Sequence, residues 1–337
     1  MNSEKALTII IPVYNVSQYI NQCLDSLTED KEILGDLEII VVNDGTPDDS
    51  AEKARVYSDR YPDSVILVNK ENGGHGSALN VGIEMATGKY LRALDSDDWV
   101  KPDGLAGQVK YIREQKPGEE ADAIINPYEA IWEMDGKAIR KGTLELKDPS
   151  GLLSLEELNR LDYLFMIYTT CVKTEIYRNN RIPKIDEGIF YDDIEYTAYT
   201  IPYIHTVKYL PDVVYQYRLG TAGQSMNPAN KLKRQWMYEQ VLDVVYDYSR
   251  VGGEAQKMIE RRLAYMVGTD LEIYLMWDDR KKAKAEFRKV YDRYSGLPLD
   301  RNSNKKMQLL NRTGLVGFGL VGWLFKMKTK RNWKQSM

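Results

Sequence analysis

Residues 6–15, "ALTIIIPVYN", form an apolar run that predicts a buried β-strand ending near Pro12. Residues 17–27 follow with apolar side chains at helical spacing behind Ser17, a residue type that often caps a helix. The alternation continues to residue 98, with predicted strands at 37–45, 64–70 and 89–98 and predicted helices at 46–61 and 76–86. Because strand and helix alternate with short connections, the sequence predicts an α/β fold with a mostly parallel sheet and helices on both faces.

The pattern changes after about residue 100. Strand-like segments at 121–132, 137–146 and 205–220 surround a predicted helix at 154–165, and residues 230–294 have mainly helical periodicity. The sequence therefore predicts three parts, which are a domain over residues 1–227, a helical extension over residues 228–310 and a tail over residues 311–337.

The bulk composition limits the classes of protein. The 337-residue chain has a net charge of −4, so we expect no nucleic-acid partner. Its two cysteines, Cys23 and Cys171, lie far apart, which is more typical of reduced thiols in a cytoplasmic protein than of a disulfide. With only His75 and His205 present, a zinc site rich in histidine is not expected. The N-terminus has no pattern of a signal peptide, so a cytoplasmic location is predicted.

The tail has a composition of its own. Residues 314–325, "GLVGFGLVGWLF", carry no charge, and residues 326–337 carry five positive charges and no acid, which leaves −9 on residues 1–325. Twelve residues are too few to span a bilayer, which needs about 20. We therefore expect the tail to lie at the inner face of the cell membrane, anchored by Trp323, Phe325 and Trp333. The alternative is a C-terminal core element with a solvated charged end.

Two common nucleotide-binding motifs are missing. No G-x-G-x-x-G follows the first strand, where "PVYN" (12–15) stands instead, and no G-x-x-x-x-G-K-[ST] occurs in the chain. Their absence argues against a dinucleotide-dependent dehydrogenase and a P-loop NTPase.

Polar residues stand at the ends of the predicted strands. Ligands bind at the C-terminal ends of strands in such folds, and Asn15, Asp44, Asn72 and Asp95 are all expected there. The carboxylate of Asp44 could accept the imide N–H of a uracil, or it could be an ordinary turn residue before a glycine.

A glycine-rich segment, "ENGGHGSALNVG" (71–82), opens the helix after the third strand. Gly73, Gly74 and Gly76 would let the backbone approach a ligand closely, and a helix N-terminus favours phosphate. The alternative is a glycine-rich loop without a ligand. We expect His75, inside this segment, to be a structural residue rather than a catalytic one.

"LDSDDW" (94–99) places three carboxylates within four positions. Hard divalent cations such as Mg²⁺ take one or two carboxylates together with substrate phosphates, and the spacing of Asp95 and Asp97 suits this. The alternative is an acidic loop in which Asp98 or Asp103 caps the next helix.

Two later segments carry further candidates. Asp192 and Asp193 stand at the start of a predicted helix, where the helix dipole favours acids, and either could instead serve as a general base. Arg218 lies beside a glycine-broken loop that contains Gln224 and Ser225, and a guanidinium suits a diphosphate, although a lone Arg is commonly a surface residue.

Taken together, six motifs resemble family 2 glycosyltransferases with the GT-A fold, whose mostly parallel, Rossmann-like sheet is flanked by helices. They occur in the order of the family and cover residues 7 to about 227. The motifs are "TIIIPVYN" (8–15), "EIIVVNDGTPDDS" (38–50), "NGGHGSALNVGIEMATGKY" (72–90), "LDSDDW" (94–99), "FYDDIEY" (190–196) and "YRLGTAGQSM" (217–226). The resemblance implies an inverting transferase of a nucleotide-activated sugar, usually a UDP-sugar, that uses Mg²⁺ or Mn²⁺.

The resemblance also implies roles for single residues. Asp44 matches the base-binding aspartate, Asp95 and Asp97 match the D-x-D pair that contacts ribose and metal, and Asp193 matches the catalytic base. The remaining nucleotide-binding candidates are Pro12, Tyr14, Asn15, Asn72, Gly73, Gly76 and Arg218, and the candidates for sugar or acceptor contacts are Trp99, Asp192 and Ser225.

One departure concerns the nucleotide phosphates. Many family members have Ala-Arg-Asn where this chain has Ala78-Leu79-Asn80, so a cation is missing. Arg218 or His75 could compensate for it.

The expected reaction is transfer of a sugar from a UDP-sugar to a hydroxyl of a glycan or a lipid-linked acceptor, in the synthesis of surface polysaccharide. Two rivals stay open, a nucleotidyltransferase and a non-catalytic partner subunit that binds a nucleotide sugar. The first would typically have a glycine-rich basic loop after strand one, which residues 12–20 lack. Whether the protein forms an oligomer is left open.

Overall fold

The computed structural model describes residues 4–116, 118–146, 148–221, 228–299, 309–310 and 312–334. It divides into two compact units, Met1–Leu219 and Gly220–Met337. The boundary therefore lies eight residues before the end that the sequence predicts for the first domain.

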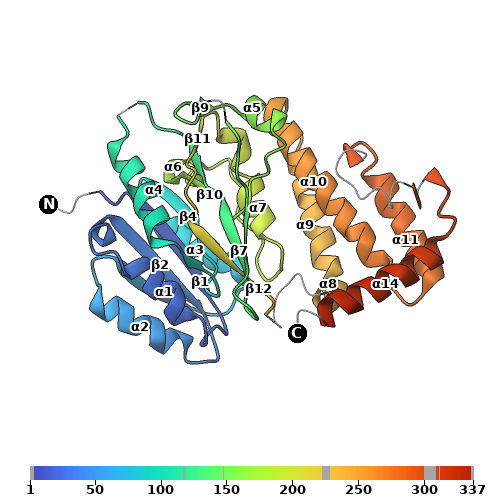
Figure 1. The fold of residues 1–337 in the computed structure, drawn as a ribbon, viewed down its shortest axis with the longest axis horizontal. Coiled ribbons are helices and arrows are strands. Elements are labelled where there is room, and N and C mark those ends of the chain that lie inside the picture. Colours follow the sequence, from blue (N-terminus) through green and yellow to red (C-terminus); the bar gives the residue numbers. More distant parts are fainter. Residues whose placement is uncertain are drawn as a thin grey trace. The chain divides into compact units, whose positions relative to one another are not determined.

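A large sheet forms the centre of the first unit (Figure 1). Its strands are β1 (Leu7–Val13), β2 (Leu37–Asp44), β3 (Val65–Lys70), β4 (Tyr90–Ala93), β6 (Ala123–Ile125), β9 (Leu152–Leu153), β10 (Thr170–Lys173) and β11 (Val207–Tyr209). The spatial order is β3-β2-β1-β4-β10-β6-β11-β9. The first four strands are parallel, and β10 runs antiparallel to both β4 and β6. The predicted α/β class is confirmed, but the sheet is mixed rather than mostly parallel.

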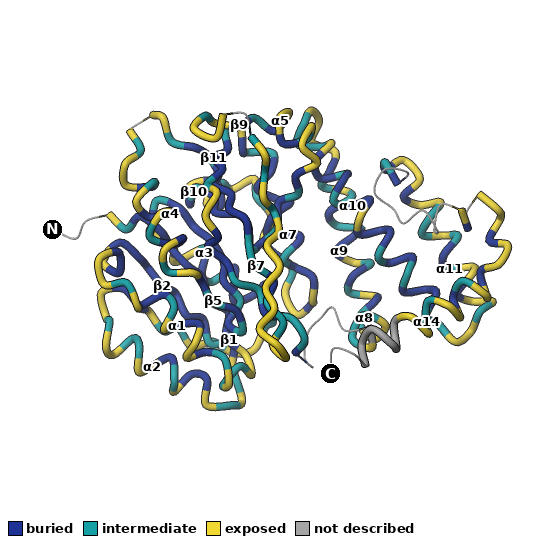
Figure 2. The backbone as a smooth tube through the Cα atoms, in the orientation of Figure 1, coloured by how far each residue is buried: buried dark blue, intermediate teal, exposed yellow. Residues whose placement is uncertain are grey.

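Four helices accompany the parallel half of the sheet, namely α1 (Ile20–Thr28), α2 (Ser50–Arg60), α3 (His75–Met85) and α4 (Pro102–Glu114). All seven residues of β1 are buried, as Figure 2 shows by the dark tube along this strand. Ile9 and Ile11 join the core that α1 and α4 line. Ile10, which points to the opposite face, lies against α3, where a Cβ on Gly82 would be 2.4 Å from its side chain. An unbroken apolar run is therefore required here because helices pack on both faces of β1.

A smaller sheet carries part of the site described below. It consists of β5 (Trp99–Val100), β12 (Tyr215–Leu219), β7 (Tyr128–Trp132) and β8 (Ala138–Lys141), in the order β5-β12-β7-β8. β12 pairs antiparallel with β5, so residues more than a hundred positions apart lie beside each other. The short helices of the first unit are α5 (Leu155–Arg160), α6 (Thr174–Tyr177) and α7 (Asp193–Ala198), with 3₁₀ turns at Leu34–Asp36 and Ile201–Tyr203.

The second unit is helical, as the periodicity of residues 230–294 predicts (Figure 1). Its helices are α8 (Pro228–Lys233), α9 (Gln235–Tyr248), α10 (Gly253–Tyr274), α11 (Arg280–Arg293) and α14 (Phe318–Lys334). Among the described residues, no helix has the length and apolar character that crossing a bilayer requires. Cys23 and Cys171 are buried free thiols, in agreement with the sequence prediction.

Two glycines of α4 provide a test of how tightly this helix packs. A Cβ at Gly104 would lie 1.9 Å from the carbonyl oxygen of Val213, whereas a Cβ at Gly107 would meet only Asp212, at 3.9 Å. We expect Gly104→Ala to lower the free energy of unfolding by about 3 kcal/mol or more, because backbone must move. Gly107→Ala should be neutral or stabilising by up to about 1 kcal/mol, because alanine favours the helix. Chemical denaturation of both variants measures this, and equal stabilities would contradict the packing.

Candidate active site

The predicted site residues of three neighbouring strands lie at one edge of the main sheet. β2, β1 and β4 are adjacent and parallel, so their carboxyl ends face the same way. Asp44 is the last residue of β2, and Asp95 follows β4 by two positions. Tyr14 and Asn15 follow β1 and are exposed, whereas Pro12 is buried within it. The expectation that these residues share an edge is thus met.

Asp44 organises the glycine-rich loop after β3. Its Oδ1 accepts hydrogen bonds from Lys70 Nζ at 2.6 Å and from the Gly73 N–H at 2.9 Å, and its Oδ2 accepts one from the Gly74 N–H at 2.7 Å. The side chain is only 4% exposed. Its charge is therefore compensated within the protein, and it holds the start of α3 in place. Asn72, in the same loop, is exposed.

The glycines of this loop also allow another chain segment to approach. Gly74 has a φ of +89°, and a Cβ there would lie 2.9 Å from the nitrogen of Gly188, whose N–H donates to the Gly73 carbonyl at 2.7 Å. A Cβ at Gly76 would lie 2.2 Å from the Asp186 carbonyl oxygen. Gly76 is thus required for packing against residues 185–192, and its role in nucleotide binding stays a prediction.

Asp95, Asp97 and Asp98 form an acidic cluster whose carboxylate oxygens lie within 4.8 Å of one another. Asp98 is buried and is held by β12, because its Oδ2 accepts from the Tyr215 hydroxyl at 2.6 Å and its Oδ1 accepts from the Arg218 N–H at 2.7 Å. The Tyr215 oxygen in turn accepts from the Asp95 N–H at 3.2 Å. Burial, and then the charges of the other two carboxylates, raise the pKa of Asp98 well above its usual range.

The donor set of the acidic cluster fits a hard divalent cation. Both oxygens of Asp98 are engaged, which leaves the partly exposed Asp95 and Asp97 to offer oxygens. Burial, followed by repulsion from Asp95, raises the pKa of Asp97 to about 6. A nearby divalent charge favours the ionised form of such a group, and carboxylate oxygens are the ligands that Mg²⁺ and Mn²⁺ prefer.

His75 joins the acidic cluster to the second acidic segment, a role that the sequence did not reveal. As the first residue of α3 it places Nδ1 3.0 Å from Asp192 Oδ2 and Nε2 3.2 Å from Asp95 Oδ1. Burial acts to lower the pKa of His75, but the carboxylates of Asp192 and Asp95 raise it well above the usual value. The imidazolium therefore donates to both carboxylates. No sequence pattern links residues 75, 95 and 192. The only signal in the sequence for a special role of His75 was its position in the glycine-rich loop.

Asp193 begins α7, directly after Asp192, and is partly exposed. Burial raises the pKa of Tyr217, and the charges of the acidic cluster and of Asp193 raise it further. Asp193 and the acidic cluster thus both act on Tyr217, and the role of Asp193 as a base stays a prediction. Asp192 is buried, 3% exposed, and is committed to His75.

Arg218 of β12 is already engaged by the first unit. Its guanidinium lies between the rings of Tyr19 and Trp99, 4.4 and 4.7 Å from their centroids. Its Nε donates to the Asp97 carbonyl at 2.7 Å, and its NH2 group donates to Gln22 at 2.7 Å. Arg218 and Trp99 thus support the backbone of the acidic cluster, and their contacts with a diphosphate or a sugar stay predictions. Ser225 lies outside the described residues.

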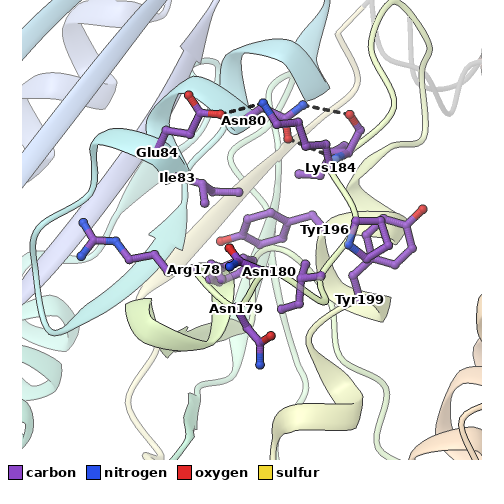
Figure 3. Close-up of a pocket in the computed structure, with 13 residues that line it drawn as sticks. Asn80, Ile83, Glu84, Arg178, Asn179, Asn180, Lys184, Tyr196 and Tyr199 are labelled. Carbon is purple, nitrogen blue, oxygen red and sulfur yellow. Dashed lines mark hydrogen bonds and ion pairs between the residues drawn. The ribbon is translucent and has the colours of Figure 1, made fainter.

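A pocket of about 490 Å³ lies elsewhere in the first unit (Figure 3). Its lining includes Asn80 and Glu84 of α3, Lys184, and Tyr196 and Tyr199 of the α7 region, and the close-up shows Lys184 bonded to Glu84. None of the predicted site residues lines it. The side-chain amide of Asn80 donates to the Ile185 carbonyl at 2.9 Å, which holds residues 185–192 against α3.

Comparison with known proteins identifies related chains. Residues 8–141 match the family described as Glycosyl transferase family 2. The minor teichoic acid biosynthesis protein GgaB of Bacillus subtilis (strain 168) is 24% identical over 275 residues, which cover 81% of this chain and 29% of GgaB. The uncharacterized glycosyltransferase YibD of Escherichia coli (strain K12) is 30% identical over 225 residues, which cover 65% of this chain and 63% of YibD. The chain thus spans less than two thirds of the length of either relative.

A solved structure shares the fold. The crystal structure of S. aureus TarS 1–349 in complex with UDP-GlcNAc superimposes with a TM-score of 0.64 and 17% sequence identity, covering 98% of this chain and 92% of that one. The similarity identifies a GT-A type arrangement, in agreement with the predicted fold.

We expect Asp98, but not Asp97, to stabilise the folded protein. We expect Asp98→Ala to lower the free energy of unfolding by roughly 2–5 kcal/mol, since it leaves the Tyr215 hydroxyl and the Arg218 N–H buried without acceptors. Asp97→Ala should leave the stability of the metal-free protein unchanged or raise it by about 1 kcal/mol, because repulsion with Asp95 is removed. Chemical denaturation without metal measures both. Equal losses in the two variants would contradict this division.

His75→Phe tests the bridge between the two acidic segments. The change preserves volume but leaves the buried Asp192 carboxylate without its charged partner. We expect a loss of roughly 2–3 kcal/mol in the free energy of unfolding, below the cost for a fully buried pair because His75 is 30% exposed. His205→Phe, at the exposed second histidine, is the matched control and should be neutral. A His75 variant as stable as this control would rule out the bridge.

Proposed function

We propose that the protein transfers a sugar from a nucleotide sugar to an acceptor hydroxyl with inversion at the anomeric carbon, because residues 8–141 match the family described as Glycosyl transferase family 2. The observation that carries the proposal is the bridge through His75. It connects Asp95 of the acidic cluster, where a nucleotide and its metal would lie, with Asp192, the neighbour of the proposed base Asp193.

The proposed donor is a UDP-sugar. A carboxylate offers about four acceptor positions, of which Asp44 uses three for Lys70, Gly73 and Gly74. One position on Oδ2 is left for the imide N–H of a uracil. TarS binds UDP-GlcNAc, which supports this class of donor without identifying the sugar. Tyr14 and Asn15, which follow β1, are proposed to line the nucleotide site, together with Pro12, Asn72, Gly73 and Gly76.

Asp95 and Asp97 are proposed to hold Mg²⁺ or Mn²⁺. The bound cation would supply Lewis-acid stabilisation of the leaving diphosphate. Arg218 contributes indirectly, since its Nε holds the Asp97 carbonyl and its guanidinium packs on Trp99. Trp99, which is partly exposed, remains a candidate for the sugar pocket.

Asp193 is proposed as the general base. Its carboxylate takes the proton of the acceptor hydroxyl, whose oxygen attacks the anomeric carbon on the face opposite the diphosphate. The bond from that carbon to the diphosphate oxygen breaks and UDP leaves, so no covalent enzyme intermediate forms. His75 pairs with the adjacent Asp192 at 3.0 Å and so ties the start of α7 to the acidic cluster.

The proposed acceptor is a glycan or a lipid-linked saccharide in surface polysaccharide synthesis. The name of GgaB refers to minor teichoic acid biosynthesis, which supports this class of pathway. A cytoplasmic location is proposed because Cys23 and Cys171 are buried free thiols.

Asp193→Asn tests the assignment of the base. We expect UDP release in the presence of Mn²⁺, a donor sugar and acceptor to fall by about 10²–10⁴-fold, because the amide cannot accept the proton. Metal-dependent UDP binding, measured by calorimetry, should remain. Asp59→Asn, an exposed aspartate of α2, is the control and should keep the wild-type rate.

Three outcomes would overturn parts of this proposal. Full UDP release by Asp193→Asn would exclude its role as the base. Binding of UDP-sugars by the wild-type protein without any release would identify a non-catalytic binding subunit. Pyrophosphate production from a nucleoside triphosphate and a sugar phosphate would identify a nucleotidyltransferase.

A further inference from the structure

The outward face of α14 is apolar. Leu320, Trp323, Leu324 and Met327 are spaced by three, one and three positions, so they share one face of the helix. Their exposed fractions are 63%, 55%, 52% and 53%, and Val316, in the turn before the helix, is 75% exposed. A surface helix of a globular protein normally packs its large apolar side chains against the core, whereas these residues of α14 are exposed.

The opposite face of α14 is already packed within the second unit. Phe318 is buried, and its ring meets Phe287 of α11 edge-to-face at 5.5 Å. A Cβ at Gly322 would lie 3.0 Å from the Leu275 carbonyl oxygen, so the helix backbone approaches the end of α10 closely. Lys326 Nζ pairs with Asp278 at 2.7 Å. The helix is thus fixed by one face, and the apolar face stays outward.

Charge is distributed very unevenly between the two units. Residues 220–337 contain 23 lysines and arginines against 12 aspartates and glutamates, a net charge of +11. Residues 1–219 contain 23 against 38, a net charge of −15. Within α14 itself, residues 326–334 carry five basic residues and no acid, and Lys328 is exposed. The apolar face therefore belongs to a unit with a strongly positive net charge.

We propose that the apolar face of α14, formed by Val316, Leu320, Trp323, Leu324 and Met327, docks the protein on an anionic membrane surface. The apolar side chains enter the boundary between head groups and acyl chains, and the basic residues meet lipid phosphates. A helix of this length is about 25 Å long and interrupted by charge, which suits lying in the interface rather than spanning it. An anchored enzyme would meet a lipid-linked acceptor at the surface.

A second copy of this chain is the less favoured occupant. Pairing two α14 faces would bring two units of +11 together, and like charges oppose such a contact. An anionic bilayer supplies both the opposite charge and an apolar interior. The membrane assignment does not depend on sugar transfer, because the test below uses neither donor nor acceptor.

Co-sedimentation of the full chain with vesicles tests the proposal. We expect binding to phosphatidylcholine vesicles that contain phosphatidylglycerol and at least about tenfold weaker binding to pure phosphatidylcholine, with further weakening between about 0.1 M and 1 M NaCl. Trp323→Glu should reduce binding at least about tenfold, since a charge replaces a buried ring. Trp236→Glu is the matched control, because Trp236 of α9 is 58% exposed in the same unit, and it should bind like the wild type.

The structural side effects are small because Trp323 lies on the outward face, and a thermal melt of each variant checks this. Equal binding of wild type and Trp323→Glu would overturn the proposal. Failure of the wild-type protein to bind anionic vesicles would also overturn it. The same holds if light scattering shows a stable dimer in solution that Trp323→Glu dissociates. Loss of vesicle binding with normal UDP release would leave the proposed function untouched.

Discussion

Like-charge repulsion at the end of β4 is the constraint around which the candidate site is arranged. Asp95, Asp97 and Asp98 bring three carboxylates within 4.8 Å of one another, with Asp98 buried and the other two partly exposed. The protein compensates two of them from distant parts of the chain. Asp98 receives a hydroxyl and a backbone N–H from β12, and Asp95 receives the imidazolium of His75. The third, Asp97, keeps a raised pKa, which a divalent cation would bring down.

This compensation explains why the smaller sheet and residues 185–192 are folded where they are. β12 pairs with β5 so that Tyr215 and Arg218 reach the acidic cluster. Residues 185–192 approach the start of α3 through Gly74 and Gly76, which brings Asp192 to His75. The charge network therefore joins four segments that are separate in sequence, namely the start of α3, the acidic cluster, residues 185–192 and β12. Asp193 occupies its position because Asp192, one residue earlier, is tied into that network.

The two units differ in the sign of their net charge, which is −15 for residues 1–219 and +11 for residues 220–337. The acidic first unit contains the three-carboxylate cluster that is proposed to hold a cation. The basic second unit turns an apolar helix face to its surroundings. In the proposed docking, the attraction to an anionic surface comes from the second unit, because only that unit has a positive net charge.

The sequence by itself determined the elements of the first hundred residues, because unbroken apolar runs such as β1 leave no alternative to a strand covered on both faces. It also identified Asp95 and Asp97 as the candidate cation ligands, because closely spaced carboxylates repel one another unless a cation compensates their charge. It did not determine that the sheet is mixed, because β10 inserts by long-range pairing that no local pattern encodes. The sequence did not reveal that Gly76 also permits close packing against the Asp186 carbonyl, or that the Arg218 guanidinium packs on the rings of Tyr19 and Trp99. Their predicted contacts with a ligand stay predictions. The bridge through His75 and the outward apolar face of α14 depend on which segments meet in space. Only the tertiary structure decides that, because contacts between distant residues are set by packing and not by spacing along the chain.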